Sequence, residues 1–193
     1  MKPYMVLEEQ IDCSKELFMM TYMDLNHIAP IHRGLNSWVD ARKAKFEFFP
    51  WGSHQDVPFN LEAPKCGLYL PYYMAWKGYA GVEPPFGAKW ECTYPYEMRE
   101  TYPGLHIKSS LKAHCGGVLN KLEFYAMTPS DKVTDAAIAA YRETAAEDTV
   151  ATENLQWDWD HNPPTGGTFH PLLPSGVKHW KDWIAKYEQG EKG

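Results

Sequence analysis

Residues 118–156, VLNKLEFYAMTPSDKVTDAAIAAYRETAAEDTVATENLQ, decide the fold because a strand and a long helix meet there. The first ten residues mix aliphatic and aromatic side chains in a way that is typical of a strand. Beyond Pro129 the composition changes: residues 134–156 are rich in Ala and Glu and contain neither Gly nor Pro. This segment predicts one long helix that is capped by Thr134.

The residues before this stretch predict an antiparallel sheet. From about 44 to 128 the chain is rich in Phe, Tyr and Trp, and Pro and Gly interrupt it every few residues. Further strands are predicted at four segments: AKFEFF (44–49), CGLYLPYYMAW (66–76), AKWECTY (88–94) and LHIKSSL (105–111). Strands in the middle and helices at the ends predict an α+β fold with a curved antiparallel sheet and flanking helices.

Two more helices are predicted, one at each end of the chain. Residues 14–28 show apolar side chains at helical spacing, with Ser14 as the N-cap and Pro30 as the residue that ends or kinks the helix. A last helix is predicted from Ser175 to Tyr187, with an apolar face that consists of Val177, Trp180, Trp183, Ile184 and Tyr187. Residues 157–167, WDWDHNPPTGG, are predicted to form a loop.

Composition limits the possible classes of protein. The chain has 193 residues, 44% of them hydrophobic, which fits a single domain over residues 1–193 with a sizeable core. A net charge of −6 argues against a nucleic-acid partner or an anionic membrane surface. No apolar run approaches the roughly 18 residues of a membrane span, and no export signal is evident, so we expect a cytoplasmic protein. Its four cysteines are then expected to be buried free thiols, with disulfides as the alternative.

Three polar residues close together in the sequence could carry chemistry: Asp24, His27 and His32, in the string DLNHIAPIH. Asp24 and His27 are three residues apart and share a helix face. His27 and His32 are five apart, which a straight helix would place on different faces, but Pro30 lies between them and can bend the chain. Two neutral imidazoles at one point suit iron or zinc. The alternative is a pair of ordinary histidines near a helix end.

The long helix offers a third metal ligand. Asp148 falls on its predicted buried face, together with apolar and small neighbours: Tyr141, Thr144, Thr152 and Leu155. Glu143 and Glu147 are predicted to be solvated. Two histidines and one carboxylate form the facial arrangement that leaves positions open for dioxygen on ferrous iron. The alternative is that all these acids form a charged outer face of the helix.

The stretch IDCSKELFMMTYMDLNHIAPIHRGL, residues 11–35, resembles the iron-binding helix in the catalytic domain of Rieske-type non-heme iron oxygenases. The family pattern D-x2-H-x4-H is matched at Asp24, His27 and His32. AEDTVATENLQ, residues 146–156, is similar to a later helix of the family, in which an aspartate followed five residues on by glutamate supplies the third ligand. This carries over to Asp148, with Glu153 as the marker.

The resemblance implies a mononuclear Fe(2+) site with His27, His32 and Asp148 as ligands. It implies hydroxylation or dihydroxylation, or oxidative demethylation, of a small aromatic or other apolar molecule with O2. Asp24 would not be a ligand; it would accept a hydrogen bond from His27 and connect the iron to the incoming electron. The implied pocket is lined by the aromatic sheet and by residues near the first helix: Met19, Met23, Leu35 and Trp38.

The electrons in this family come from a [2Fe–2S] Rieske cluster, which belongs to the neighbouring subunit of a homotrimer and is served by a reductase or ferredoxin. Such a cluster needs C-x-H and C-x2-H pairs. None of the four cysteines has a histidine at either spacing: SKE follows Cys13, GLY follows Cys66, TYP follows Cys92 and GGV follows Cys115. The sequence therefore predicts that residues 1–193 hold no Rieske domain, that the cluster sits on a partner or missing domain, and that this chain is inactive without such an electron donor.

Two other functions are open at this stage. The first is a metal-free module that binds an apolar small ligand, because the helix-grip fold that we expect, as in START and Bet v 1-like proteins, also encloses apolar ligand cavities. The second is a zinc-binding hydrolase that uses the same three ligands. A Ser/His/Asp hydrolase lacks support because the sequence has no G-x-S-x-G elbow.

Overall fold

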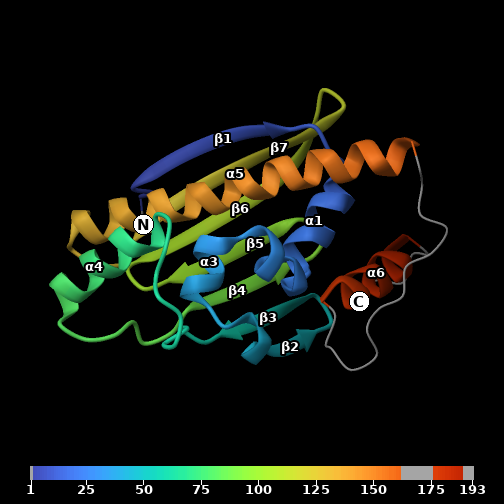
Figure 1. The fold of residues 1–193 in the computed structure, drawn as a ribbon. Coiled ribbons are helices and arrows are strands. Elements are labelled where there is room, and N and C mark those ends of the chain that lie inside the picture. Colours follow the sequence, from blue (N-terminus) through green and yellow to red (C-terminus); the bar gives the residue numbers. More distant parts are fainter. Residues whose placement is uncertain (1, 162–175, 189–193) are drawn as a thin grey trace.

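A seven-stranded antiparallel sheet forms the centre of the computed structural model, which describes residues 2–161 and 176–188. Its strands lie in the order β1-β7-β6-β5-β4-β3-β2 (Figure 1). The strands β2 to β7 follow one another across the sheet in chain order, and β1 pairs with β7 at the other edge. The strand bounds are Met5–Ile11 (β1), Lys45–Phe49 (β2), Gly52–Val57 (β3), Ala88–Thr93 (β4), Glu97–Tyr102 (β5), Leu105–His114 (β6) and Gly117–Ala126 (β7).

Helices cover one face of this sheet. The helix α5 lies along the sheet, and α1, α3 and α4 lie on the same side (Figure 1). The α-helices are Lys15–Met23 (α1), Ile28–Ile31 (α2), Arg33–Trp38 (α3), Tyr69–Ala80 (α4), Asp131–His161 (α5) and Gly176–Glu188 (α6), with short 3-10 turns at Leu25–His27 (η1) and Ala41–Lys43 (η2). The α+β helix-grip fold predicted from the sequence is therefore confirmed.

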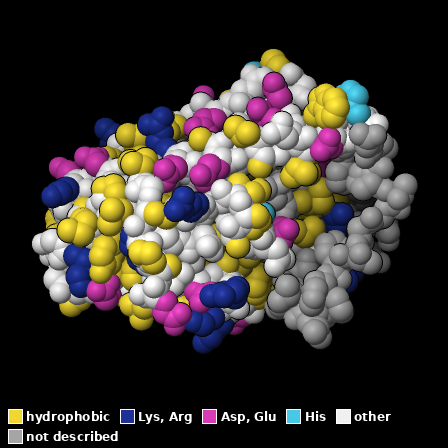
Figure 2. All heavy atoms as spheres, viewed as in Figure 1, with side chains coloured by type: hydrophobic (Ala, Val, Ile, Leu, Met, Phe, Trp, Pro, Cys, Tyr) yellow, Lys and Arg dark blue, Asp and Glu magenta, His cyan; other side chains and the backbone are white. Residues whose placement is uncertain are grey.

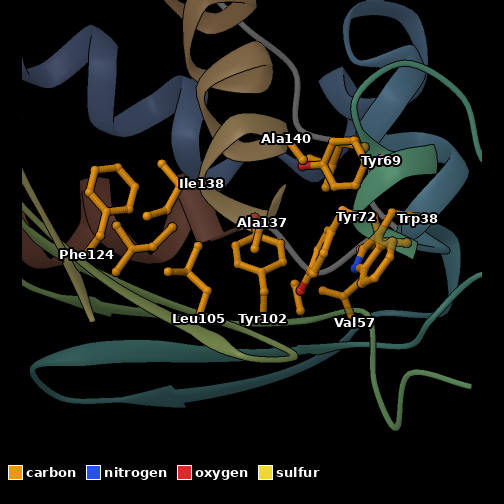
Figure 3. Close-up of a cluster of buried hydrophobic side chains, with 14 of the residues drawn as sticks. Trp38, Val57, Tyr69, Tyr72, Tyr102, Leu105, Phe124, Ala137, Ile138 and Ala140 are labelled. Carbon is orange, nitrogen blue, oxygen red and sulfur yellow. The ribbon is translucent and has the colours of Figure 1, made fainter. Parts of the chain in front are cut away.

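Alternating burial along the strands creates the core. In β6 and β7 every second side chain is buried, so that Ile107 and Phe124, which are register partners, both point toward the helices. Figure 3 shows Ala137 and Ile138 of α5 packed over this surface. At the other end of the cluster the indole of Trp38 stacks on the ring of Tyr72, with centroids 4.2 Å apart. A second cluster packs α1 and α6 against the sheet.

One predicted strand is a helix. Residues 66–76 contain most of α4, whose buried side chains Tyr69, Tyr72 and Ala75 recur every third residue. That spacing is helical rather than alternating. Pro71 is compatible with the helix because it lies in the first turn, where a backbone N–H has no partner within the helix. The aromatic composition predicted a strand here, but helical packing against α5 determines the structure.

The long helix extends beyond its predicted limits at both ends. It begins at Asp131, the Val133 amide donates to Ser130 Oγ (3.4 Å), and the predicted cap Thr134 is a fully buried residue inside the helix. Residues 157–161, predicted as loop, form its last turn, and the rest of that predicted loop, 162–167, lies outside the described residues. The extra turn is stabilised at i,i+4 spacing, because the ring of His161 stacks on Trp157 with centroids 4.3 Å apart.

The two terminal helices follow the prediction more closely. The Leu17 amide donates to Ser14 Oγ (3.2 Å), which confirms Ser14 as the N-cap of α1, although α1 ends at Met23. In α6 the predicted apolar face packs on the second cluster, with Trp180 fully buried and partly buried neighbours Val177, Trp183 and Ile184. Ser175 and the side chain of Tyr187 lie outside the described part of the chain.

The surface mixes charges of both signs. Figure 2 shows acidic and basic side chains interspersed over the helix-bearing face. Among the described residues, no helix combines the length and the apolar character that crossing a bilayer requires. All four cysteines are free thiols, as predicted; Cys13 and Cys92 are buried, whereas Cys66 is half-buried and Cys115 is exposed.

Candidate metal centre

Two interruptions of the helical chain bring His27 and His32 together. Asp24 ends α1 in an extended conformation, and its carboxylate Oδ1 accepts from the Asn26 amide (3.0 Å) to start the 3-10 turn that holds His27. His32 leaves helical geometry (φ −103°, ψ 80°) between α2 and α3. Pro30, predicted to be the bend, lies inside α2 instead. As a result His27 Nε2 lies 3.1 Å from His32 Nε2.

The third predicted ligand reaches the same point from α5. Asp148 Oδ1 lies 2.9 Å from His32 Nε2 and 3.4 Å from His27 Nε2. His32 is fully buried, whereas the side chains of His27 and Asp148 are 15% and 27% exposed. In the described part of the chain these three residues form the group whose ligand atoms could share one metal ion.

The donor set fits a transition-metal ion. Two ligand atoms that are each about 2.1 Å from one ion and at right angles to each other lie about 3 Å apart. The three separations between ligand atoms, 2.9, 3.1 and 3.4 Å, agree with this value. One carboxylate and two imidazoles are the donor set of a two-histidine, one-carboxylate iron site.

The Nδ1 atoms of both histidines have oxygen partners, which leaves both Nε2 atoms for a metal. His32 Nδ1 lies 2.8 Å from Glu147 Oε2, and His27 Nδ1 contacts the backbone oxygen of Asp24. A proton on Nδ1 that is donated to such an acceptor fixes the tautomer in which Nε2 carries the lone pair. The side chains and the backbone therefore orient both imidazoles toward the point that Asp148 also faces.

The contacts of three acidic residues were predicted only in part or not at all. Asp24 was expected to accept a hydrogen bond from His27; the acceptor is its backbone oxygen, whereas its carboxylate accepts from Asn26. Glu147, predicted to be solvated, contacts His32, a role that sequence reasoning missed because the direction of His32 Nδ1 depends on the tertiary structure. Glu143, also predicted to be solvated, accepts from the Leu68 amide (3.0 Å) and joins α5 to α4.

The charges within the centre stabilise one another. Burial acts to raise the pKa of Asp148, but hydrogen bonds from His27 and His32 outweigh it and lower the pKa. Burial acts to lower the pKa of His32, but its contacts with Asp148 and Glu147 outweigh it and raise the pKa. Two carboxylates thus surround the imidazole pair, and this surplus of negative charge suits a divalent cation.

A pocket opens beside the centre. His27, His32 and Asp148 line it, and the empty space within it, with the open solvent at its mouth included, is about 640 Å³. Of the four residues predicted to line the substrate pocket, Leu35 does so. The other three, Met19, Met23 and Trp38, are fully buried in the core.

The predicted buried face of α5 extends as far as Thr152. Tyr141 and Thr144 line the pocket with Asp148, and Thr152 is fully buried. Leu155, predicted to lie on the same face, is 46% exposed. Glu153, the expected sequence marker, accepts from the Asp12 amide (3.1 Å) and so joins α5 to the segment that follows β1.

Comparison with curated proteins finds two relatives, both named putrescine 2-hydroxylase. The relative from Bordetella bronchiseptica is 28% identical over 191 residues, which cover 92% of this chain and 44% of that protein. The relative from Ralstonia nicotianae is 28% identical over 189 residues, which cover 91% of this chain and 51% of that protein. The chain thus spans about half the length of these relatives. No protein-family model matches it.

Solved structures of Rieske monooxygenases share the fold. The quaternary ammonium Rieske monooxygenase CntA in complex with an inhibitor superimposes with a TM-score of 0.74 and 15% identity, over 96% of this chain and 49% of that one. Dicamba monooxygenase bound to 3,6-dichlorosalicylic acid gives a TM-score of 0.61 and 12% identity, over 97% of this chain and 60% of that one. The described chain therefore has the fold of a Rieske oxygenase catalytic domain.

Proposed function

We propose that this chain is the mononuclear non-heme Fe(II) unit of a Rieske-type oxygenase, with His27, His32 and Asp148 as the iron ligands. The observation that carries the proposal is the convergence of His27 Nε2, His32 Nε2 and Asp148 Oδ1 beside the pocket that these residues line. The reaction inserts one atom of O2 into a C–H bond and reduces the other to water with two electrons and two protons.

The iron, when bound, supplies the site at which dioxygen binds and is activated. The chain itself supplies the rest of the centre. Glu147 and the backbone oxygen of Asp24 keep the imidazoles in the tautomer that offers Nε2. The buried apolar walls of the pocket keep water away from the reacting C–H bond and hold the substrate next to the ligand cluster.

The substrate that the family resemblance implies, an aromatic or other apolar small molecule, stays a prediction. The names of the two curated relatives favour hydroxylation of an amine instead. The electron source is also part of the proposal: a Rieske cluster that lies outside residues 1–193, on a neighbouring subunit of a homotrimer, with a reductase or ferredoxin behind it. Inter-subunit electron transfer described for the similar CntA supports this arrangement.

The pocket also suits a second function, in which the chain binds an apolar small ligand without a metal. Its walls include Phe18, Leu25, Ile28, Leu35 and Met98. Metal analysis separates this alternative, and the zinc hydrolase, from the oxygenase.

The proposal predicts that the protein, reconstituted anaerobically with Fe(II) and desalted, keeps about one iron per chain. The His27→Ala/His32→Ala variant is expected to keep almost none, because it loses two of three ligands. Elemental analysis measures both. The matched control is His54→Ala on β3, which removes a histidine outside the cluster and is expected to leave the iron content unchanged.

If the wild type and the double variant keep equally little iron, the oxygenase proposal is wrong and the metal-free module is favoured. Stoichiometric zinc that stays with the protein through purification, together with hydrolytic turnover, favours the hydrolase instead.

A further inference from the structure

A buried carboxylate lies in the pocket without a cationic partner. Glu100 of β5 is 5% exposed. Its Oε2 accepts from the Tyr102 hydroxyl (2.8 Å) and its Oε1 from the Tyr141 hydroxyl (3.0 Å). No described lysine, arginine or histidine forms a salt bridge with it. Neutral hydroxyls stabilise a buried charge less than a counterion does, so this carboxylate is incompletely compensated.

The rest of the pocket adds negative charge. Glu9 and Asp148 line it together with Glu100, and none of its described lining residues is a lysine or arginine. Burial raises the pKa of Glu100 to about 7, the repulsion from Asp148 acts in the same direction, and the hydrogen bonds from Tyr102 and Tyr141 act against it. The metal would neutralise charge around Asp148, but it gives Glu100 no direct partner.

Aromatic side chains surround this carboxylate. Trp90, Tyr102 and Tyr141 line the pocket, and the Trp90 indole Nε1 donates to the Tyr102 hydroxyl (3.1 Å). Aromatic faces attract organic cations. The Tyr22 hydroxyl also lines the pocket and is buried with no hydrogen-bond partner among the described residues. Burying such a hydroxyl without a partner costs free energy unless a ligand forms a hydrogen bond with it, and its oxygen can accept a hydrogen bond from an N–H group of a bound ligand.

We propose that Glu100 holds the positively charged nitrogen of an amine substrate, with the Tyr22 hydroxyl as a second acceptor and the aromatic rings as walls. The substrate class is then a small organic ammonium ion, whose apolar part occupies the space beside the metal ligands. The inference rests on the proposed function, because it takes the same pocket as the oxygenase site. Glu100 is a specificity-determining residue; it does not ligate the metal.

The test measures the binding of three small probes to the iron-loaded protein by calorimetry. We expect 1,4-diaminobutane to bind at least tenfold more tightly than 1,4-butanediol, which has the same chain length without charge, and than toluene. In Glu100→Gln the affinity for the diamine is expected to fall at least tenfold, because the amide keeps an acceptor for the tyrosines but lacks the charge. Glu91→Gln on β4, which removes a half-exposed carboxylate, is the matched control with unchanged affinity.

The pH dependence gives a second measurement. An acid of pKa about 7 is about 10% ionised at pH 6 and about 90% at pH 8, so the diamine affinity of the wild type is expected to rise about tenfold between them. The titratable groups facing Glu100 are Asp148 from α5, the Cys92 thiol from β4 and the hydroxyls of Tyr22, Tyr69, Tyr102 and Tyr141. They are all retained in Glu100→Gln, so a flat profile in that variant assigns the slope to Glu100.

The iron content of each variant separates the two proposals. Equal diamine affinity in the wild type and in Glu100→Gln, a preference for toluene, or no diamine binding by iron-loaded protein overturns the role of Glu100 and leaves the iron site intact. The comparison of the three probes on the wild type does not depend on how a variant folds. Loss of iron in the wild type itself overturns the proposed function instead.

Discussion

At the scale of single residues, the candidate centre depends on the hydrogen-bond partners of its proposed ligands as much as on the proposed ligands themselves. The contact between His32 Nδ1 and Glu147 Oε2 (2.8 Å) selects the tautomer of an imidazole that is fully buried and cannot exchange protons freely with water. The backbone oxygen of Asp24 does the same for His27. A substitution at Asp24 therefore acts on His27 mainly through the turn that its carboxylate caps.

The role of Glu147 predicts a loss of metal affinity without loss of a ligand. Glu147→Ala is expected to weaken Fe(II) binding about 10- to 100-fold, because His32 loses the acceptor that orients it. Glu147→Gln keeps an acceptor oxygen and is expected to lose less. Competition with a chelator measures the affinities. Glu143→Gln, one turn earlier on α5, is the control, and wild-type affinity in Glu147→Ala would refute the role.

At the scale of elements, α5 connects the sheet, the helices α1 to α4 and the candidate metal centre. Its N-terminal part packs on the sheet, its Glu143 joins α4, and its Asp148 reaches the segment between α1 and α3. The turn between β5 and β6 approaches this helix closely. At Gly104, where φ is +87°, an added Cβ would lie 2.8 Å from Val133 Cγ1 of α5.

Gly104→Ala is therefore expected to lower the free energy of unfolding by about 2 kcal/mol or more, from backbone strain together with the clash against α5. The matched control is Gly116→Ala, at φ +84°, where an added Cβ meets no atom within 4 Å and only the backbone strain applies. Urea unfolding compares the two variants. Equal destabilisation would show that the contact of this turn with α5 contributes nothing.

At the scale of the whole molecule, the sheet and its helices enclose a pocket and a candidate metal centre. No cysteine of the sequence stands at the C-x-H or C-x2-H spacing of a Rieske cluster. The fold is that of the catalytic domain of Rieske oxygenases, and the chain spans about half the length of its curated relatives. The redox chemistry of the proposed reaction therefore has to begin outside these residues.

This predicts that the iron-loaded chain with reductase and NADH alone forms no hydroxylated product from 1,4-diaminobutane. Addition of a Rieske-containing partner is expected to start product formation, because two electrons then reach the centre in each turnover. Mass spectrometry measures the hydroxylated product, and an oxygen electrode measures the consumption of O2. Sustained turnover with reductase alone would contradict the assignment of the electron source.

The sequence alone determined the features that depend on local pattern. Strand composition predicted β2, β4, β6 and β7, and the absence of Gly and Pro predicted most of α5. The spacing of His27 and His32 suggested a metal site, and the family resemblance implied His27, His32 and Asp148 as its ligands. The same local reasoning took α4 for a strand, because aromatic composition does not distinguish a strand from a helix that is buried against another helix.

Tertiary structure decided what depends on direction and on burial. The contact of Glu147 with His32 requires the orientation of an imidazole that two breaks in the helix create. Glu100 lies on a strand whose alternation is ordinary, and only the packing of α5 over β5 buries its carboxylate among tyrosine hydroxyls. Spacing along a chain fixes which residues can meet, whereas the solvation and the partners of a charge arise only when distant elements close around it.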